Sequence, residues 1–264
     1  MGHVTVDVIA AGHSRRPGGG AFYSALQAAR LGLRTLIVTQ GSPPEIEALL
    51  EPYRGELELH IIPAPASTTL ETSWSGATRT QRLLAWAGAM GEEPAVDTGI
   101  LHLAPIARET PRSWQGRAGF IGLTPQGLLR AWSKHDGVLS PAPLDSHRLP
   151  EHLDAIVLSK HEHAICEGRI PAPVIAVTAG AKPAEIFLPE EEVLRVEVPA
   201  TGNPRDDLGA GDVFAAAFFV ALFEGQDPAH AASFANAAAA IRIQGPGPGA
   251  IGDRAAIEAR LRSA

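Results

Sequence analysis

Short runs of consecutive apolar residues alternate along the chain with segments in which apolar residues recur every three to four positions. The runs are rich in β-branched residues and typical of buried strands, and they cover residues 34–40, 99–105, 118–124, 154–159 and 173–180. The helical repeat is found in residues 21–32 and 210–223, and the alanine-rich composition of residues 229–240 indicates a further buried helix. Buried strands that alternate with helices predict an α/β fold in which helices cover both faces of a mostly parallel sheet.

Two further segments, residues 3–12 and 67–76, alternate apolar with polar residues and carry many Thr and Ser side chains. Strands with this pattern have one face in water. We therefore expect a small β flap, or lid, formed by residues 3–16 and 66–80 at the edge of the sheet. The connections are short and no linker is evident, so residues 1–264 are predicted to form a single domain.

Composition narrows the function. A formal net charge of −7 argues against nucleic acid as the main partner. No apolar run is long enough to span a bilayer, and the first residues lack the basic-then-apolar pattern of a signal peptide. Cys166 is the single cysteine, which rules out a disulfide framework and favours a reducing setting. These totals predict a cytoplasmic protein with neither a membrane nor a nucleic acid as partner.

Residues 206–214, DDLGAGDVF, place two glycines and an aspartate at the start of a helix that should be buried. Glycine weakens a helix and a carboxylate is costly in a core, and such conflicts tend to mark functional sites. Gly209, Ala210 and Gly211 let a ligand approach helix N–H groups that lack partners, which makes an anion pocket. Asp212 in the first turn should stay ionised and can accept a proton from a hydroxyl. The pattern suits phosphoryl transfer to an alcohol; a glycine-rich helix start with an acidic residue is the alternative.

The stretch DDLGAGDVFAAAFFVAL (206–222) resembles the second signature of the ribokinase-like (PfkB) carbohydrate kinases, D-T-x-G-A-G-D-x-F. Four more segments are similar, in the same order, to the family's Gly-Gly helix entrance, its N-x-x-E element, its nucleotide turn and its adenine-side helix. They are RPGGGAFYSALQAARLG (16–32), AIVLSKHEHA (155–164), VIAVTAGAKPAEIF (174–187) and FANAAAAIRIQGPGPGA (234–250). The resemblance covers nearly the whole chain. It implies a three-layer α/β sandwich with a doubly wound, mostly parallel sheet and a small β lid.

The resemblance also implies an activity: ATP-dependent phosphorylation, with Mg²⁺, of a hydroxyl on a small polyol. The polyol would be a sugar, a cyclitol such as myo-inositol, or a nucleoside. GGGAFYS (18–24) and TPQG (124–127) are similar to the inositol-kinase-like branch of the family. Family members often pair through the lid, and apolar lid residues permit a homodimer here.

On the substrate side, the resemblance implies that Asp212 is the catalytic base and that the backbone of Gly209, Ala210 and Gly211 holds the migrating phosphoryl group. It places further residues at the polyol: Asp7, Gly18, Gly19, Tyr23 and Arg79. Tyr23 stands where family members often carry Asn. A tight turn for the glycines, an exposed strand aspartate and a solvated arginine are the alternatives.

For the metal, the resemblance implies that Glu162 organises Mg²⁺ around the phosphates, although Ser159 replaces the family's Asn. The same patch raises a second hypothesis, a transition-metal site that includes His161, His163 and Cys166. On a helix His163 and Cys166 share a face while His161 points elsewhere, and neither H-E-x-x-H nor paired cysteine spacing is present.

For the nucleotide, the resemblance implies that Thr178 and Gly180 lie at the phosphates and Asn236 near the adenine. Thr178 and Gly180 follow a predicted strand, where open sheets bind ligands. Pro183 stands where the family's second glycine is expected, so only the first half of the motif carries over. A polar residue that bridges neighbouring elements is the alternative for Asn236.

Two further departures qualify the resemblance. Gly2 already aligns with the exit of the family's first core strand, so we expect most of that strand to be missing. Asp207 and Leu208 replace threonines before the GAGD turn, which leaves a requirement for a monovalent cation open. The missing strand, Ser159 and Pro183 favour the alternative to an active kinase, a catalytically impaired nucleotide- or sugar-binding regulatory protein. A dinucleotide oxidoreductase ranks lower, because no G-x-G-x-x-G follows a strong strand.

Overall fold

A computed structural model describes residues 1–9, 14–75, 78–91, 95–166 and 170–263. Its largest sheet has six strands in the order β14-β13-β12-β11-β8-β7. Four of these pair in parallel, and β13 and β14 add an antiparallel edge. The strands are β7 (Thr98–Leu103), β8 (Ala118–Leu123), β11 (Ala155–Ser159), β12 (Val174–Ala179), β13 (Lys182–Phe187) and β14 (Val193–Val196).

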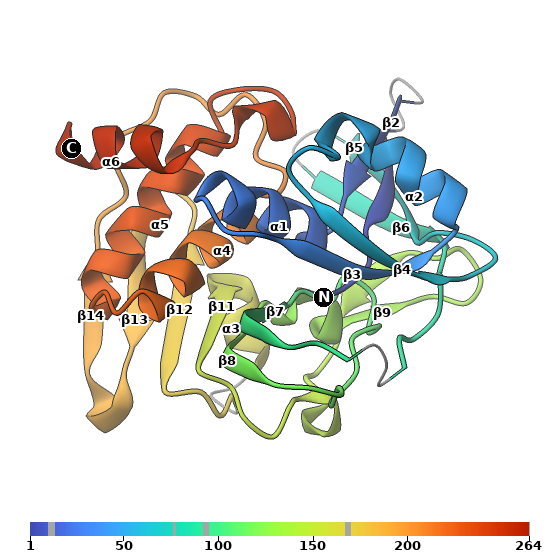
Figure 1. The fold of residues 1–264 in the computed structure, drawn as a ribbon, viewed down its shortest axis with the longest axis horizontal. Helices are drawn as coiled ribbons and strands as arrows, with labels where there is room; N and C mark the ends of the chain where they lie inside the picture. The colour runs from blue at the N-terminus through green and yellow to red at the C-terminus, as the bar shows by residue number, and fades with distance from the viewer. Residues whose placement is uncertain (10–13, 76–77, 92–94, 167–169, 264) are drawn as a thin grey trace.

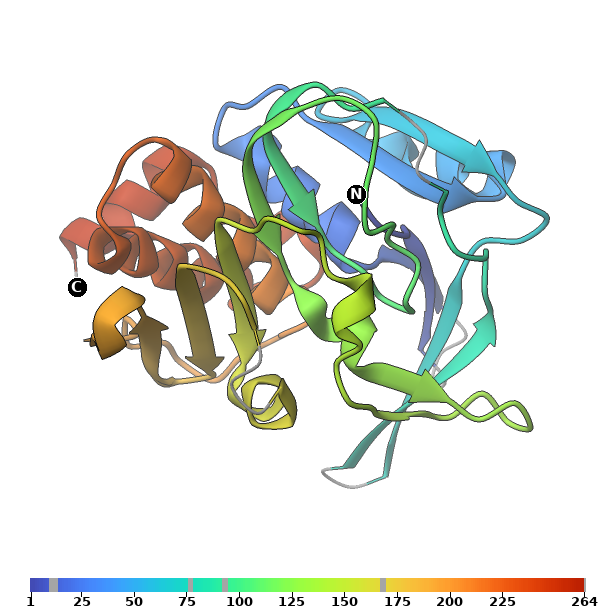
Figure 2. The same cartoon turned by 90° about the horizontal axis from the view of Figure 1, so that it is seen from below.

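Helices cover both faces of this sheet. On one face lie α1 (Gly20–Arg30), α4 (Ala210–Phe223), α5 (Pro228–Arg242) and α6 (Arg254–Arg262), and on the other lies the short α3 (Lys160–Cys166). Figure 2 shows the two layers on either side of the strands. The alanines of α4 and α5 are almost all buried, and their small side chains allow the two helices to pack closely. The mostly parallel sheet between two helical layers confirms the predicted fold class.

The lid is a separate four-stranded sheet in the order β2-β1-β5-β6, with β1 and β5 parallel. It lies on the side of the molecule away from the C-terminus (Figure 1), near a hairpin of β9 (Arg130–Trp132) and β10 (Leu139–Pro141). Its strands are β1 (Thr5–Ile9), β2 (Ser14–Gly18), β5 (Thr69–Ser75) and β6 (Thr78–Ala85). Because β1 and β2 lead directly into α1, the lid is tied to the start of that helix.

A third, two-stranded parallel sheet is formed by β3 (Leu36–Gly41) and β4 (Glu58–Pro63), with α2 (Pro43–Leu50) between them in sequence. β3 does not pair with β7; the two edges face each other across a groove. Met1 bridges the edges at one end. Its amino group donates to His102 O (2.7 Å) and its carbonyl accepts from Ala104 N (2.8 Å), while Gly2 N donates to Val38 O (3.1 Å).

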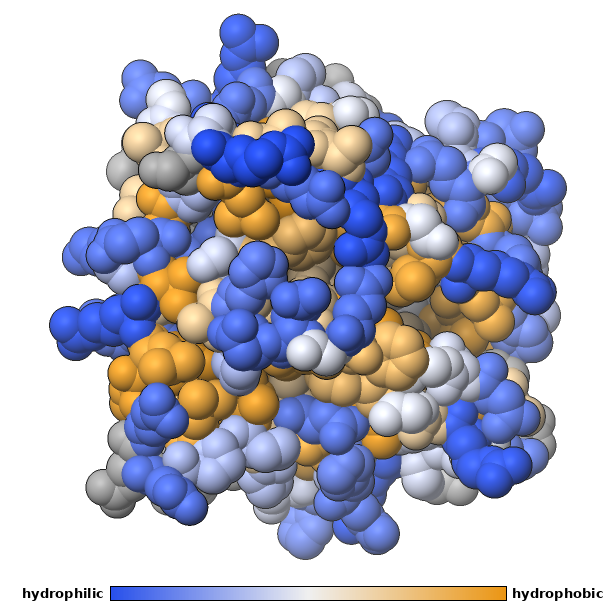
Figure 3. Space-filling model, turned by 60° about the vertical axis from the view of Figure 1, so that its left-hand side comes forward, coloured by the Kyte–Doolittle hydropathy of each residue, from blue (hydrophilic) through white to orange (hydrophobic). Residues whose placement is uncertain are grey.

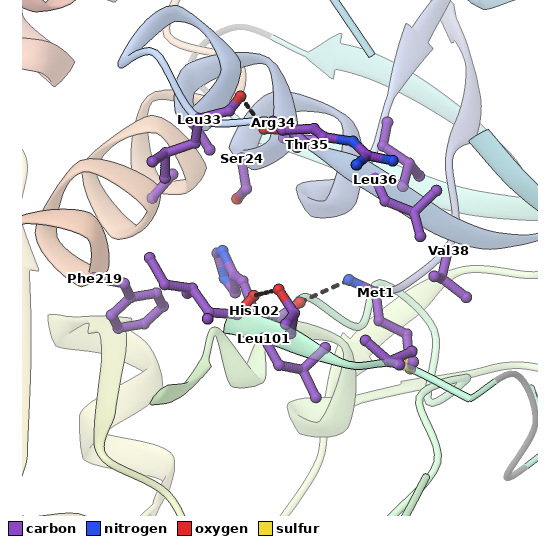
Figure 4. A pocket seen from close by; sticks show the side chains of 18 of the residues that line it. Met1, Ser24, Leu33, Arg34, Thr35, Leu36, Val38, Leu101, His102 and Phe219 are labelled. Atoms are coloured by element: carbon purple, nitrogen blue, oxygen red, sulfur yellow. Dashed lines mark hydrogen bonds between the residues drawn. The ribbon is translucent and has the colours of Figure 1, made fainter. Parts of the chain in front are cut away.

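The two bonds of Met1 straddle Leu103, which is the pattern of a parallel strand pair. A backbone bonded on both sides lies about 4.8 Å from each neighbour, so the groove between β3 and β7 is about 10 Å, or one strand, wide. The cavity there has a volume of about 570 Å³ and is lined mainly by apolar side chains (Figure 4). It lies directly before Gly2, the residue at which the sequence comparison expected a core strand to end.

Large apolar side chains are exposed at a few positions among the described residues, and two of them, Leu36 and Phe223, line this groove. Figure 3 shows one face of the molecule, on which hydrophobic residues form patches that hydrophilic residues interrupt. Within the described ranges, each helix is too short or too polar to cross a bilayer.

Candidate active site

The GAGD turn forms the start of α4. Gly209, the N-cap, has φ 78° and ψ 2°, a left-handed conformation that favours glycine. A side chain at Gly209 would also overlap the ring of Tyr23. Ala210 N donates to Asp207 O (3.1 Å) within the turn, so its N–H is already used. The N–H groups of Gly211 and Asp212 have no acceptor inside the helix, and these two, rather than Ala210, can meet an anion.

Asp212 lies where the N-terminal ends of α1 and α4 meet. A Cβ built on Gly20, the first residue of α1, would lie 2.8 Å from Asp212 Oδ1. Ser24, one turn further along α1, donates its hydroxyl to Asp212 O (3.2 Å). The positive ends of two helix dipoles therefore converge on the carboxylate. Glycine at position 20 is what allows the two helices to approach so closely.

The pKa of Asp212 corrects a prediction. The sequence suggested that a first-turn carboxylate would stay ionised, but burial raises the pKa of Asp212 to about 7. The negative charges of Glu162 and Asp7 raise it further, and the positive charge of Arg130 opposes them. Burial and two neighbouring carboxylates thus outweigh the helix dipole. A carboxyl group that titrates near neutral pH is suited to general base catalysis.

Asp7 brings a second carboxylate to the site from β1. It is 5% exposed and accepts a hydrogen bond from Thr5 Oγ1 (2.7 Å). Any side chain at Gly18 would overlap the Asp7 carboxylate. Gly19, the N-cap of α1, has φ 87°, and a side chain there would run into the carbonyl of His3. The glycine pair therefore serves both the turn and the close approach of Asp7.

Tyr23 and Arg79, which were also predicted to bind the substrate, differ from Asp7 and the glycines in what the structure shows of them. Tyr23 is 1% exposed and packs beneath Gly209, with a pKa raised by burial to about 12. It supports the turn from inside, so the prediction that its side chain faces the substrate is wrong. The side chains of Arg79 and of the neighbouring Trp74 lie outside the described residues.

Arg130 is a site residue that the sequence analysis missed. It begins β9, donates to Gln81 Oε1 (3.2 Å) and Ile106 O (3.4 Å), and its charge acts on Asp212. It follows the TPQG stretch (124–127) closely. That proximity was the available signal, but nothing in the local pattern shows that β9 folds back toward α4.

Glu162 and Ser159 form a capping box at the start of α3. Glu162 Oε2 accepts from Ser159 N (2.7 Å) and Ser159 Oγ (2.9 Å), and Glu162 N donates to Ser159 Oγ (3.3 Å). The carboxylate is half-buried, and its charge acts on Asp212. One oxygen remains for a cation, and Mg²⁺ is commonly held by one carboxylate together with phosphates and waters. The residues present therefore fit Mg²⁺.

The transition-metal hypothesis finds no support in the described part of the chain, where no three His, Cys, Asp or Glu side chains gather as ligands. His161 is exposed, and His163 packs against Phe187 with ring centroids 5.1 Å apart. Cys166 is buried, and its burial raises the pKa of the thiol to about 11. The two histidines and the cysteine thus have separate surroundings.

The predicted nucleotide residues lie on two elements. Thr178, near the end of β12, donates to Leu158 O (3.4 Å), and Gly180 in the following turn has φ 65° with open space around it. Asn236 is buried in α5 and donates to Val196 O (3.4 Å) and Glu197 O (3.0 Å). Its amide thus ties α5 to β14, as the structural alternative proposed. Nucleotide contacts of these residues stay a prediction.

Known proteins resemble this chain in sequence and in fold. Residues 150–253 match the pfkB family carbohydrate kinases. Ribokinase of Bacillus subtilis (strain 168) is 34% identical over 119 residues, a match that spans 40% of this chain and only 39% of that protein.

Two solved structures cover nearly the whole chain. A pyrophosphate-dependent kinase in the ribokinase family superposes with a TM-score of 0.80, 20% identity and 98% of both chains covered. Ribokinase of Arabidopsis thaliana has a TM-score of 0.73 and 17% identity, with 98% of this chain and 96% of that one covered. Part of the chain is thus similar in sequence to the pfkB family carbohydrate kinases and to a ribokinase. The whole chain has the ribokinase-like fold, as its sequence motifs predicted.

Proposed function

We propose that the protein phosphorylates a hydroxyl of a small polyol, with Asp212 as the catalytic base. One observation carries the proposal: a carboxyl group with a pKa of about 7 lies at the meeting point of two helix N-termini. Such a group can deprotonate an alcohol near neutral pH. The adjacent N–H groups and dipoles stabilise the negative charge of the phosphoryl group in the transition state.

The residues divide the work between the two substrates. Asp7 accepts hydrogen bonds from polyol hydroxyls, and the absence of a side chain at Gly18 gives the Asp7 carboxylate the space that it occupies. Asp212 takes the proton of the attacking hydroxyl while Gly211 N–H contacts the migrating group. Arg130 adds positive charge on the acceptor side. Glu162 would hold Mg²⁺, which supplies positive charge to the phosphates when bound.

ATP is the phosphoryl donor that we propose first, since a ribokinase of this fold is described in complex with ribose and ATP and a fructokinase with ADP and a calcium ion. Pyrophosphate is the second candidate. Several structures of the same fold are pyrophosphate-dependent kinases, one complexed with a pyrophosphate analog and myo-inositol. Asn236, expected at the adenine, already uses its amide on backbone carbonyls, which favours a donor without a base.

The polyol itself is proposed as a sugar, a cyclitol such as myo-inositol, or a nucleoside. A regulatory protein without turnover is the alternative, and Ser159 and Pro183 in place of the family's residues favour it. A homodimer through the lid and a cytoplasmic location also stay predictions.

The test is a matrix of acceptors and donors. Ribose, fructose, myo-inositol and adenosine are each incubated with ATP or with pyrophosphate and MgCl₂, and phosphorylated product is measured by mass spectrometry. We expect turnover of one acceptor, abolished in Asp212→Asn. A ligand present at a hundredfold excess over its Kd should add about 2.7 kcal/mol to the free energy of unfolding. Thermal protection by polyol and donor without any product would refute the kinase and support the regulatory alternative.

A further inference from the structure

A fully buried arginine lies beneath the segment that leads to the GAGD turn. Arg242, the last residue of α5, is 0% exposed. Its guanidinium donates to three carbonyl oxygens, those of Asp206 (3.2 Å), Leu208 (2.6 Å) and Gly245 (3.1 Å), and to Asp206 Oδ2 (3.2 Å). It also lies 5.5 Å from the centre of the Tyr23 ring. A charge without access to water is tolerated only when it is compensated in this way.

The carboxylate of Asp206 connects this cation to the backbone around it. It accepts from Leu208 N (3.0 Å) and Gly247 N (2.9 Å) as well as from Arg242. Burial alone would raise the pKa of Asp206, but the two N–H donors and the guanidinium hold it below its ordinary value. Arg16 of the lid strand β2 reaches the same carboxylate at 3.5 Å.

These oxygens bear on the question of a monovalent cation. Such a cation is bound by a cage of carbonyl and carboxylate oxygens. The segment in question contains Asp207 and Leu208, where the family usually has threonines. The backbone carbonyls of Leu208 and Asp206 and the carboxylate of Asp206 already accept hydrogen bonds from Arg242. A metal ion there would compete with the guanidinium for its ligands and would be repelled by its charge. The residues present do not fit a monovalent cation.

We propose that Arg242 is a positioning residue that takes the place of a bound monovalent cation. Its planar guanidinium binds oxygens of residues 206, 208 and 245. It thereby fixes residues 206–208, which directly precede Gly209. Tyr23, packed between Arg242 and Gly209, transmits the same restraint to the turn. The effect on catalysis rests on the proposed kinase function; the effect on the segment does not.

Two measurements on the unmodified protein test the proposal first. Melting temperature and hydrogen exchange of the amides in residues 206–211 are compared in KCl, NaCl and tetramethylammonium chloride at equal ionic strength. We expect no difference among the three salts, and phosphoryl transfer within twofold across them. A rise in melting temperature, exchange protection or turnover that is specific to K⁺ or Na⁺ would overturn the proposal. The first two measurements decide it even if no polyol is phosphorylated.

Variants then test the charge itself. Arg242→Lys keeps the charge but loses the planar guanidinium, and Arg242→Ala leaves a cavity that guanidinium chloride at low millimolar concentration can enter. Misplacement of the turn should lower kcat about a hundredfold in Arg242→Ala, with faster exchange in residues 206–211. We expect guanidinium to restore both exchange protection and kcat in this variant. If Arg242→Ala does not fold, Arg242→Lys provides the readout: faster exchange in residues 206–211 supports the proposal, and unchanged exchange and kcat contradict it.

Discussion

The helices α1 and α4 border two regions of opposite character, the candidate active site and an apolar groove. At their N-terminal ends, Gly20 meets Asp212 close to the charges of Asp7 and Glu162. Further along, Ser24, Ala28 and Phe219 line the apolar groove of about 570 Å³ between β3 and β7. The apolar groove is thus not the region that holds the catalytic candidates. Proximity of carboxylates to helix N-termini, not volume, locates the chemistry.

Burial also shifts the pKa of a titratable side chain in opposite directions in the two regions. Burial lowers the pKa of His102 in the groove to about 3, so its imidazole stays neutral at ordinary pH. Burial raises the pKa of Asp212 to about 7, so its carboxyl group can exchange a proton there. The same physical cause, loss of hydration of the charged form, moves a base away from neutrality and an acid toward it. Only the acid becomes useful for proton transfer.

The largest effect is expected on turnover. Asp212→Asn removes the base but keeps the shape, and should lower kcat by about 10²- to 10⁴-fold with whichever acceptor the wild type uses. The matched variant, His102→Gln, removes a buried titratable side chain of the groove and should change kcat less than threefold. Equal losses of kcat in the two variants would show that Asp212 is not the catalytic base.

The second prediction concerns pH. For Asp212 the folded pKa, about 7, lies above the ordinary value of 3.8. Protonation therefore favours the folded state, and this contribution is complete below pH 4 and lost as the pH rises through 7. The loss is at most about 4 kcal/mol, and smaller because the side chain is partly exposed. Relative to the wild type, Asp212→Asn should gain stability from pH 4 to pH 8, as measured by urea unfolding.

Turnover should respond in the opposite direction. Because the base must be ionised, kcat/KM should rise about tenfold between pH 6 and pH 8. A wild type whose unfolding free energy runs parallel to that of Asp212→Asn across this range would contradict the raised pKa. A flat kcat/KM profile would argue against Asp212 as the base.

The contrast between the active site and the groove also shows which features of the structure the sequence could predict. Local periodicity gave the strands 118–124 and 154–159 and the helix 210–223, which the structure has as β8 (Ala118–Leu123), β11 (Ala155–Ser159) and α4 (Ala210–Phe223). These elements depend on residues close in sequence. The family signatures added the site candidates Asp7 and Asp212, and the structure brings both to the start of α1.

What the sequence could not predict depends on contacts between distant segments. Arg130 reaches the candidate active site because β9 folds back toward α4, and Arg242 meets Asp206 across 36 positions. The pKa of Asp212 follows from its burial and from the charges of Glu162 and Asp7 on distant elements, which no local pattern encodes. Tyr23 was expected to face the substrate because of its position in the motif, but the helix turns that side chain inward. Motifs identify residues, while packing decides their orientation and charge.

The third prediction separates two reasons why a position requires glycine, a positive φ and a lack of space for a side chain. Gly209→Ala must adopt φ 78° and must also displace the Tyr23 ring, whereas Gly225→Ala at φ 85° meets open space. The first variant should lose about 3 kcal/mol of unfolding free energy and the second about 1 kcal/mol. Gly209→Ala should also lower kcat, because it moves the anion turn. If urea unfolding gives equal losses, Tyr23 does not hold the turn.

The smallest predicted effect concerns the groove. Met1 and Gly2 already bond to both β3 and β7, so the groove has the width and polarity of one parallel strand. Fusing the strand-forming sequence Lys-Val-Ile-Val-Ile before Met1 should extend that pairing and bury apolar side chains on both faces. Burial of each of the four apolar side chains contributes about 2 kcal/mol, and ordering each of these four residues opposes this by about 1.5 kcal/mol, which leaves about 2 kcal/mol in total.

The matched control is Lys-Gly-Ser-Gly-Ser, which removes the terminal amine in the same way but has nothing apolar to bury. Relative to it, the apolar extension should raise the melting temperature and slow hydrogen exchange in β3 and β7. It should leave the pH dependence of kcat/KM unchanged, because Asp212 lies at the other end of the two helices. Equal melting temperatures would mean that the groove is not built for a strand. A shifted pH profile would mean that the groove and the candidate active site are coupled through α1 and α4, and would contradict the view that the two regions are independent.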